Sequence, residues 1–82
     1  MSKLKQFSGK EVVKIFEAHG FEVTRTIGSH VRLTFLKNDS SYRVTIPLHR
    51  LLKKGTLHGI IKDFELCFDK DETDICFFQS KN

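Results

Sequence analysis

The spacing of apolar side chains predicts a helix near the start of the chain. Ser8-Gly9-Lys10-Glu11 fits a capping box, in which the serine hydroxyl and the glutamate carboxylate each bind a free amide of the first turn. The residues that follow recur at the spacing of one helical face: Val12, Ile15, Phe16 and His19. With Gly20 as a stop, this pattern predicts a helix over about 9–19 and makes His19 a packing residue.

After this helix the apolar period shortens to two, which is typical of strands. Residues 21–26 alternate between apolar and polar side chains and predict a first strand. A second strand begins at His30 and continues to Phe35, and a third covers 42–46. Gly28-Ser29 and Lys37-Asn38-Asp39-Ser40 are turn sequences, so the three strands are expected to pair as antiparallel neighbours.

A second helix is predicted after Lys53-Lys54-Gly55, with Thr56 as its N-cap. Its apolar stripe is Leu57, Ile60, Ile61 and Phe64. In the tail, acidic residues within 69–74 precede the apolar run 75–78. Since acidic side chains suit a helix N-terminus, this arrangement favours a third short helix, with an added strand as the alternative.

The order helix, three strands, helix predicts an α+β fold in which both helices cover the apolar face of the sheet. The other face stays open and collects His30, Arg32, Thr34, Arg43 and Thr45. Because 82 residues suit one small core, we expect a single domain over 1–82, with a core at 8–64 and a C-terminal extension at 65–82.

No apolar run is long enough for a membrane span and no signal-like segment opens the chain, so a cytoplasmic protein is expected. Cys67 and Cys76 are then small buried thiols rather than a disulfide. The charge is uneven: residues 1–64 contain twelve Lys or Arg and five Asp or Glu, a net +7, whereas residues 65–82 carry −3. A basic body of this kind indicates a polyanionic partner such as nucleic acid.

His30 is the candidate for chemistry, since an exposed imidazole on a stiff strand among basic residues can move protons. His49 lies in a loop where it could face a ligand, and His58 is expected on an exposed helix position. The histidines are too scattered for a zinc motif and no Cys-x-x-Cys pair assists them, so neither a metal nor a cofactor is predicted.

Five segments in order along the chain resemble the HicA mRNA interferase toxins of prokaryotic toxin-antitoxin pairs. They are Ser8-Gly9-Lys10-Glu11-Val12, His19-Gly20-Phe21, Gly28-Ser29-His30, Val44-Thr45-Ile46-Pro47-Leu48-His49 and Lys54-Gly55-Thr56-Leu57. The resemblance covers about residues 8–64, whereas the tail has no clear family counterpart.

This resemblance implies a fold like the double-stranded RNA-binding domain and a ribonuclease that cleaves mRNA. It also implies a HicB-like antitoxin that covers the active face, and it assigns the catalytic role to His30. The residues expected to contact RNA around it are Gly28, Ser29, Arg32, Arg43, His49, Lys53 and Lys54.

The expected mechanism needs no metal: the RNA 2′-hydroxyl attacks, His30 moves a proton, and Arg32, Arg43 or Lys54 steadies the phosphorane charge. Two alternatives remain at this stage. One is an RNA-binding module without catalysis, which would use the same basic face to hold the RNA backbone. The other is a domain that binds only protein.

Overall fold

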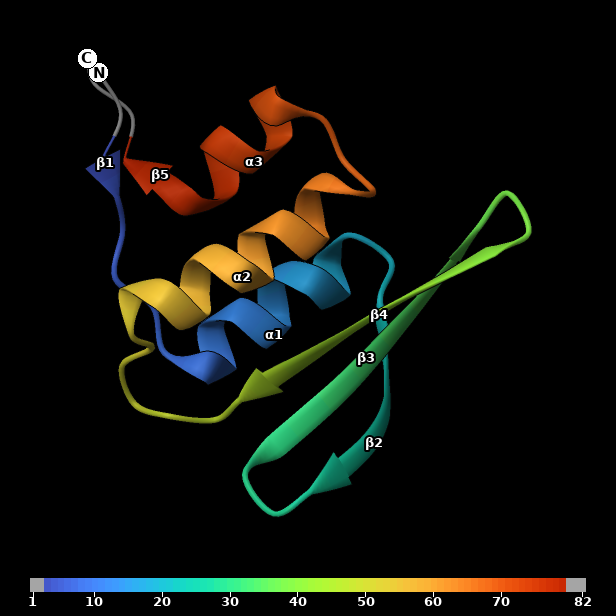
Figure 1. The fold of residues 1–82 in the computed structure, drawn as a ribbon, viewed down its shortest axis with the longest axis horizontal. Coiled ribbons are helices and arrows are strands. Elements are labelled where there is room, and N and C mark those ends of the chain that lie inside the picture. Colours follow the sequence, from blue (N-terminus) through green and yellow to red (C-terminus); the bar gives the residue numbers. More distant parts are fainter. Residues whose placement is uncertain (1–2, 80–82) are drawn as a thin grey trace.

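The computed structural model describes residues 3–79 (Figure 1). Its elements in chain order are β1 (Lys3–Leu4), α1 (Gly9–Ala18), β2 (Glu22–Ile27), β3 (His30–Lys37), β4 (Ser40–Pro47), α2 (Lys54–Glu65), α3 (Lys70–Phe77) and β5 (Phe78–Gln79). The strands β2, β3 and β4 form an antiparallel sheet in that order, and helices cover one of its faces. The predicted α+β arrangement is therefore confirmed.

Helix α1 starts at the predicted capping box. The Glu11 amide donates to Ser8 Oγ at 3.1 Å, and the Ser8 amide donates to Glu11 Oε1 at 2.8 Å. The first helical residue, Gly9, donates its amide to the His49 carbonyl oxygen at 2.9 Å. A Cβ atom at this position would overlap the Pro47 carbonyl group, so glycine lets α1 begin directly against the end of β4.

Two tight turns set the register of the sheet. Gly28 has a φ of 57°, and the Gly28-Ser29 turn makes Ile27 the partner of His30. At the other end of β3, Asn38 and Asp39 both have positive φ, as in type I′ turns, and Lys37 pairs with Ser40. Since each turn contains two residues, the turns fix the pairing of β3 with β4 along its length and the pairing of residues 30–32 with residues 25–27 of β2.

Strand β2 differs from its prediction. The alternation over 21–26 places Val23 on the buried face, yet all six residues of β2 are exposed and Val23 is 43% exposed. Val23 pairs with the buried Leu33, but β2 is the outer strand of the sheet and leaves the Val23 side chain partly exposed. A bulge follows at Thr24, since the next paired position is Arg25 with Arg32. An extra residue in one strand reverses which side chains face which way beyond it.

Helix α2 begins one turn before the predicted cap. Lys53 is its N-cap, without a capping side chain, and its carbonyl oxygen accepts the Leu57 amide at 2.9 Å. Thr56 therefore lies inside the first turn, where the prediction of an N-cap is wrong. The predicted apolar stripe of α2 is correct, since Leu57, Ile60, Ile61 and Phe64 are all buried.

The tail forms the third helix that its acidic residues favoured, and α3 packs into the core. Asp69 caps α3 by accepting the Glu72 amide at 2.8 Å. Phe77 is fully buried, with its ring centroid 5.1 Å from that of Phe64. Strand β5 pairs with β1, so the two ends of the described chain lie side by side (Figure 1).

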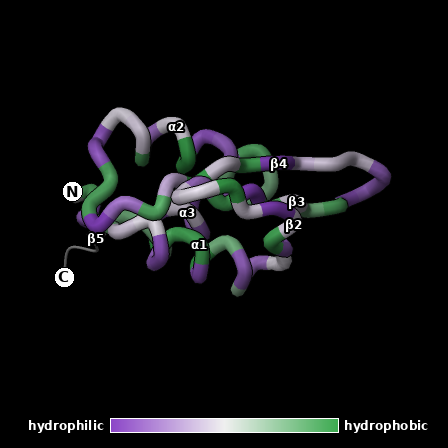
Figure 2. Tube along the Cα trace, turned by 90° about the horizontal axis from the view of Figure 1, so that it is seen from below, coloured by the Kyte–Doolittle hydropathy of each residue, from purple (hydrophilic) through white to green (hydrophobic). Residues whose placement is uncertain are grey.

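Hydrophobic and hydrophilic residues are separated along the trace. The tip of the β3–β4 hairpin projects beyond the helices and is hydrophilic (Figure 2). Cys67 and Cys76 are free thiols, as expected, but only Cys67 is buried as predicted, whereas Cys76 is partly exposed. No helix within residues 3–79 combines the length and the apolar character that crossing a membrane requires.

Candidate functional site

His30 is the first residue of β3 and stands exposed on the open face of the sheet. It pairs with Ile27 on β2 and with Pro47 on β4, so strands flank it on both sides. The Leu48 amide also donates to the Ser29 carbonyl oxygen at 2.6 Å, which ties the turn to the end of β4. The imidazole is thus carried by a stiff part of the backbone while its ring remains open to a ligand.

A shallow hollow of about 80 Å³ lies around this imidazole. It is lined by Arg25, Ile27, His30, Arg32 and Thr45. Arg25 and Arg32 occupy directly opposite positions on β2 and β3. Like charges in such positions destabilise a sheet, and an anion between them would offset this repulsion. The hollow therefore combines an imidazole with two guanidinium groups suited to a phosphate.

The two-residue turn at Gly28-Ser29 brings Arg25 to this face, because pairing Ile27 with His30 places Arg25 opposite Arg32. The bulge at Thr24 then lets Val23, in the same strand, pair with the buried Leu33. The Thr24 hydroxyl holds the distortion, because Thr24 Oγ1 lies 3.1 Å from Thr34 Oγ1 and donates to the Arg32 carbonyl oxygen at 3.4 Å.

Arg25 and Ile27 are the site residues that the sequence reasoning missed. A signal was present, since counting back through a two-residue turn at Gly28-Ser29 pairs Ile27 with His30 and places Arg25 directly opposite Arg32. Ile27 is 61% exposed and forms an apolar rim beside the imidazole.

Comparison with known protein families matches residues 9–66 to the family described as "HicA toxin of bacterial toxin-antitoxin". The match covers more than half of the chain. This chain belongs to the HicA toxin family. Comparisons with curated proteins and with solved structures gave no significant match. The family match contains the whole His30 hollow, whereas α3 and β5 lie beyond it.

Two further candidates of this HicA chain, Arg43 and His49, do not line the hollow. Arg43 is exposed on β4 opposite Thr34, on the same face as His30 but four residues along β3, which corresponds to about 13 Å. His49 is exposed after the end of β4, and its carbonyl oxygen accepts the Gly9 amide.

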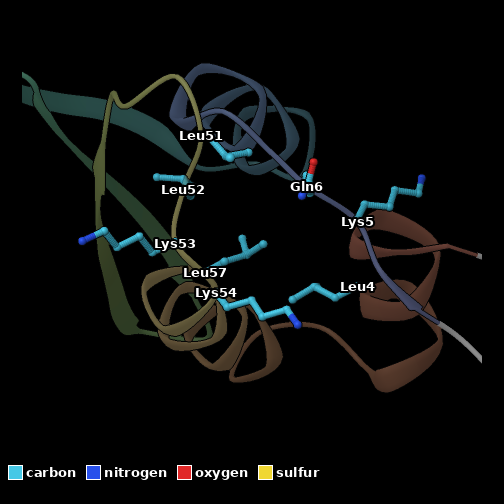
Figure 3. A pocket seen from close by; sticks show the side chains of 8 residues that line it. All are labelled: Leu4, Lys5, Gln6, Leu51, Leu52, Lys53, Lys54 and Leu57. Atoms are coloured by element: carbon cyan, nitrogen blue, oxygen red, sulfur yellow. The ribbon is translucent and has the colours of Figure 1, made fainter.

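Lys53 and Lys54 line a different hollow, of about 710 Å³, between the N-terminal segment and the start of α2 (Figure 3). The other residues around it are Leu4, Lys5, Gln6, Leu51, Leu52 and Leu57. The two lysine side chains point in different directions, with that of Lys54 running towards Leu4. The structure therefore does not bring these lysines into the His30 hollow.

His19 is a packing residue, as predicted, and lies away from this face. Its ring makes edge contacts with Phe64 and Phe68, each at a centroid distance of 5.1 Å. Burial lowers the pKa of His19, but hydrogen bonds to Glu72 and to the Ile15 carbonyl group outweigh that effect and leave the pKa raised. His58 is exposed on α2, also as predicted.

Proposed function

We propose that this HicA-family toxin is a metal-independent endoribonuclease that cleaves mRNA in the cytoplasm, with His30 as its catalytic residue. The observation that carries the proposal is the exposed His30 imidazole beside the opposed Arg25 and Arg32 in one hollow of the open face. An imidazole takes up and releases a proton near neutral pH, and a guanidinium pair binds phosphate oxygens.

In the proposed reaction, an RNA phosphate lies over Arg25 and Arg32, with the neighbouring 2′-hydroxyl directed at His30. His30 removes the proton from the 2′-hydroxyl, and the 2′-oxygen forms a bond to phosphorus. The bond from phosphorus to the 5′-oxygen breaks, and that oxygen takes a proton from the imidazolium or from water. The products are a 2′,3′-cyclic phosphate and a 5′-hydroxyl.

Each side chain has a separate role in this scheme. The two arginines stabilise the additional negative charge that develops on the phosphorane. Gly28 and Ser29 form the turn that presents His30, and their exposed backbone leaves room for the RNA strand. Arg43, His49, Lys53 and Lys54 lie outside the hollow, where they would contact phosphates further along the strand and position the RNA.

The partner that we propose for the same face is a HicB-like antitoxin. Membership of a toxin-antitoxin family supports an antitoxin partner. The apolar rim supports the location, because the exposed Ile27 side chain lines the hollow beside His30. An antitoxin that covers this side chain would bury His30 and exclude RNA.

The proposal is tested by incubating the purified protein in EDTA with a long single-stranded RNA and with DNA of the same sequence. We expect cleavage of the RNA alone, with 5′-hydroxyl ends, because only RNA has the attacking hydroxyl. His30→Ala, purified in the same way, controls for contaminating ribonuclease, and His58→Ala is the matched control. Ends carrying a 5′-phosphate would exclude this mechanism, and binding without cleavage would favour the RNA-binding module.

A further inference from the structure

Three potential metal ligands of different chemistry meet where α3 packs against the end of α1. His19, Glu72 and Cys76 each offer one ligand atom, and these atoms all lie within 4.8 Å of one another. His19 Nε2 is 2.8 Å from Glu72 Oε2 and 3.7 Å from Cys76 Sγ, and the sulfur lies 3.9 Å from Glu72 Oε2. We propose that these three residues bind a zinc ion.

The spacing is near that of a tetrahedral ion. With zinc bonds of about 2.0 Å to nitrogen or oxygen and about 2.3 Å to sulfur, neighbouring ligand atoms are separated by about 3.3–3.6 Å. The separations in the structure are 2.8 Å between nitrogen and oxygen and 3.7 and 3.9 Å to sulfur, so each differs from the tetrahedral value by about 0.5 Å or less. Small side-chain rotations therefore suffice to close the site around an ion.

The backbone already orients the histidine for this role. His19 Nδ1 lies 2.8 Å from the Ile15 carbonyl oxygen. A carbonyl oxygen only accepts hydrogen bonds, so Nδ1 carries a proton and Nε2 is left to face the other two ligands. Zinc-bound histidines commonly use this arrangement, with the second ring nitrogen donating to a carbonyl or carboxylate group.

Charge and access also suit a divalent cation. A Glu72 carboxylate and a Cys76 thiolate balance the charge of Zn²⁺, and the protons of the thiol and of His19 Nε2 pass to the solvent on binding. A hollow of about 540 Å³ lies beside the cluster, and its walls include His19, Glu72 and Lys37. The Lys37 ammonium donates to the Cys67 carbonyl oxygen at 2.9 Å, and the hollow leaves room for water in the fourth coordination position.

The proposed ion would join two parts of the molecule rather than act on RNA. His19 lies inside the region that matches the HicA family, whereas Glu72 and Cys76 are one turn apart on α3, beyond that region. His19 ends α1 just before β2, whereas His30 pairs with Ile27 at the far end of β2, so this six-residue strand, about 17 Å long by strand rise, separates them. Zinc at this site would fasten α3 to α1 and leave the His30 hollow unchanged.

The test uses the full chain without an affinity tag, in reduced form, and Co²⁺ as a spectroscopic substitute for zinc. We expect one Co²⁺ per chain, with the sulfur-to-cobalt charge-transfer band and the visible bands of a tetrahedral site, and loss of these bands when Zn²⁺ is added. Cys76→Ser should abolish the charge-transfer band. Cys67→Ala, which alters the other cysteine, should retain it.

A second variant keeps the test decisive if Cys76→Ser folds poorly. Glu72→Gln preserves a hydrogen-bonding side chain on α3, and we expect it to weaken Co²⁺ binding at least tenfold, roughly the smallest effect seen for partners of zinc ligands. Zn²⁺ should also raise the melting temperature of the native chain and not that of either variant. Absence of the charge-transfer band in the native chain, or its survival in Cys76→Ser, would overturn the proposal.

Discussion

Replacing Arg25 with glutamine should make the protein more stable and less active at the same time. Arg25 opposes Arg32 directly across the β2–β3 pair, and both side chains line the hollow beside His30. In the free protein the two guanidinium groups repel each other, so removal of one charge relieves that repulsion. In the RNA complex the same change removes a phosphate ligand.

The size of both effects follows from this geometry. Cross-strand pairs change stability by about 0.2–1 kcal/mol. For a domain of this length, 1 kcal/mol corresponds to about 4–8 °C in melting temperature. Loss of one phosphate contact to single-stranded RNA should make the slope of log K against log salt shallower by about 0.7. Cleavage should slow as well, because the phosphorane loses one of its two flanking charges.

The assay pairs thermal unfolding with RNA binding and cleavage at several salt concentrations. Lys62→Gln is the matched control, since Lys62 is exposed on α2, on the helix side of the sheet, and should change neither the salt slope nor the cleavage rate. If Arg25→Gln melts at a lower temperature and cleaves RNA at the native rate, then the arginine pair is not an anion site and the reasoning fails.

Three stability predictions follow from the packing. Phe77→Ala removes a fully buried ring and should lower the free energy of unfolding, measured in urea, by about 3–5 kcal/mol. The control Ile75→Ala, at a position 71% exposed, should change it by no more than about 0.5 kcal/mol. A loss below about 1 kcal/mol for Phe77→Ala would mean that α3 is not part of the core. Gly9→Ala should lower the free energy of unfolding by about 1–3 kcal/mol, although alanine has the better helix propensity, because the alanine Cβ would overlap the Pro47 carbonyl group. A higher melting temperature for this variant would contradict that contact. Ser8→Ala should cost about 0.5–2 kcal/mol by removing the capping box, and unchanged thermal unfolding would show that the cap contributes nothing.

The elements could be predicted where local chemistry alone determines them. The capping box of α1, the turns at Gly28-Ser29 and Asn38-Asp39, and the apolar stripe of α2 each depend on residues close in sequence. The start of α2 was predicted late, because Thr56 is a good capping residue in isolation while the helix is set by the burial of Leu57 one turn after Lys53.

The site could be predicted only in part. His30 and Arg32 follow from the alternation along β3. The alternation over 21–26 misassigns Arg25, because it groups Arg25 with Phe21 and Val23, whereas the bulge at Thr24 interrupts that alternation. The cluster of His19 with Glu72 joins residues 53 positions apart, so no spacing rule could find it. Lys53 and Lys54 are predicted to contact RNA around His30, whereas the path of the chain after β4 places them in another hollow.

The central claim is that His30 acts chemically and does not merely hold RNA. The most direct measurement compares the cleavage rate and the RNA affinity of the native chain with those of His30→Ala. We predict a loss of about 10²- to 10⁴-fold in cleavage rate, the usual contribution of one general acid or base, with RNA affinity essentially unchanged. Equal losses in rate and affinity, or cleavage that persists in His30→Ala, would contradict the catalytic role.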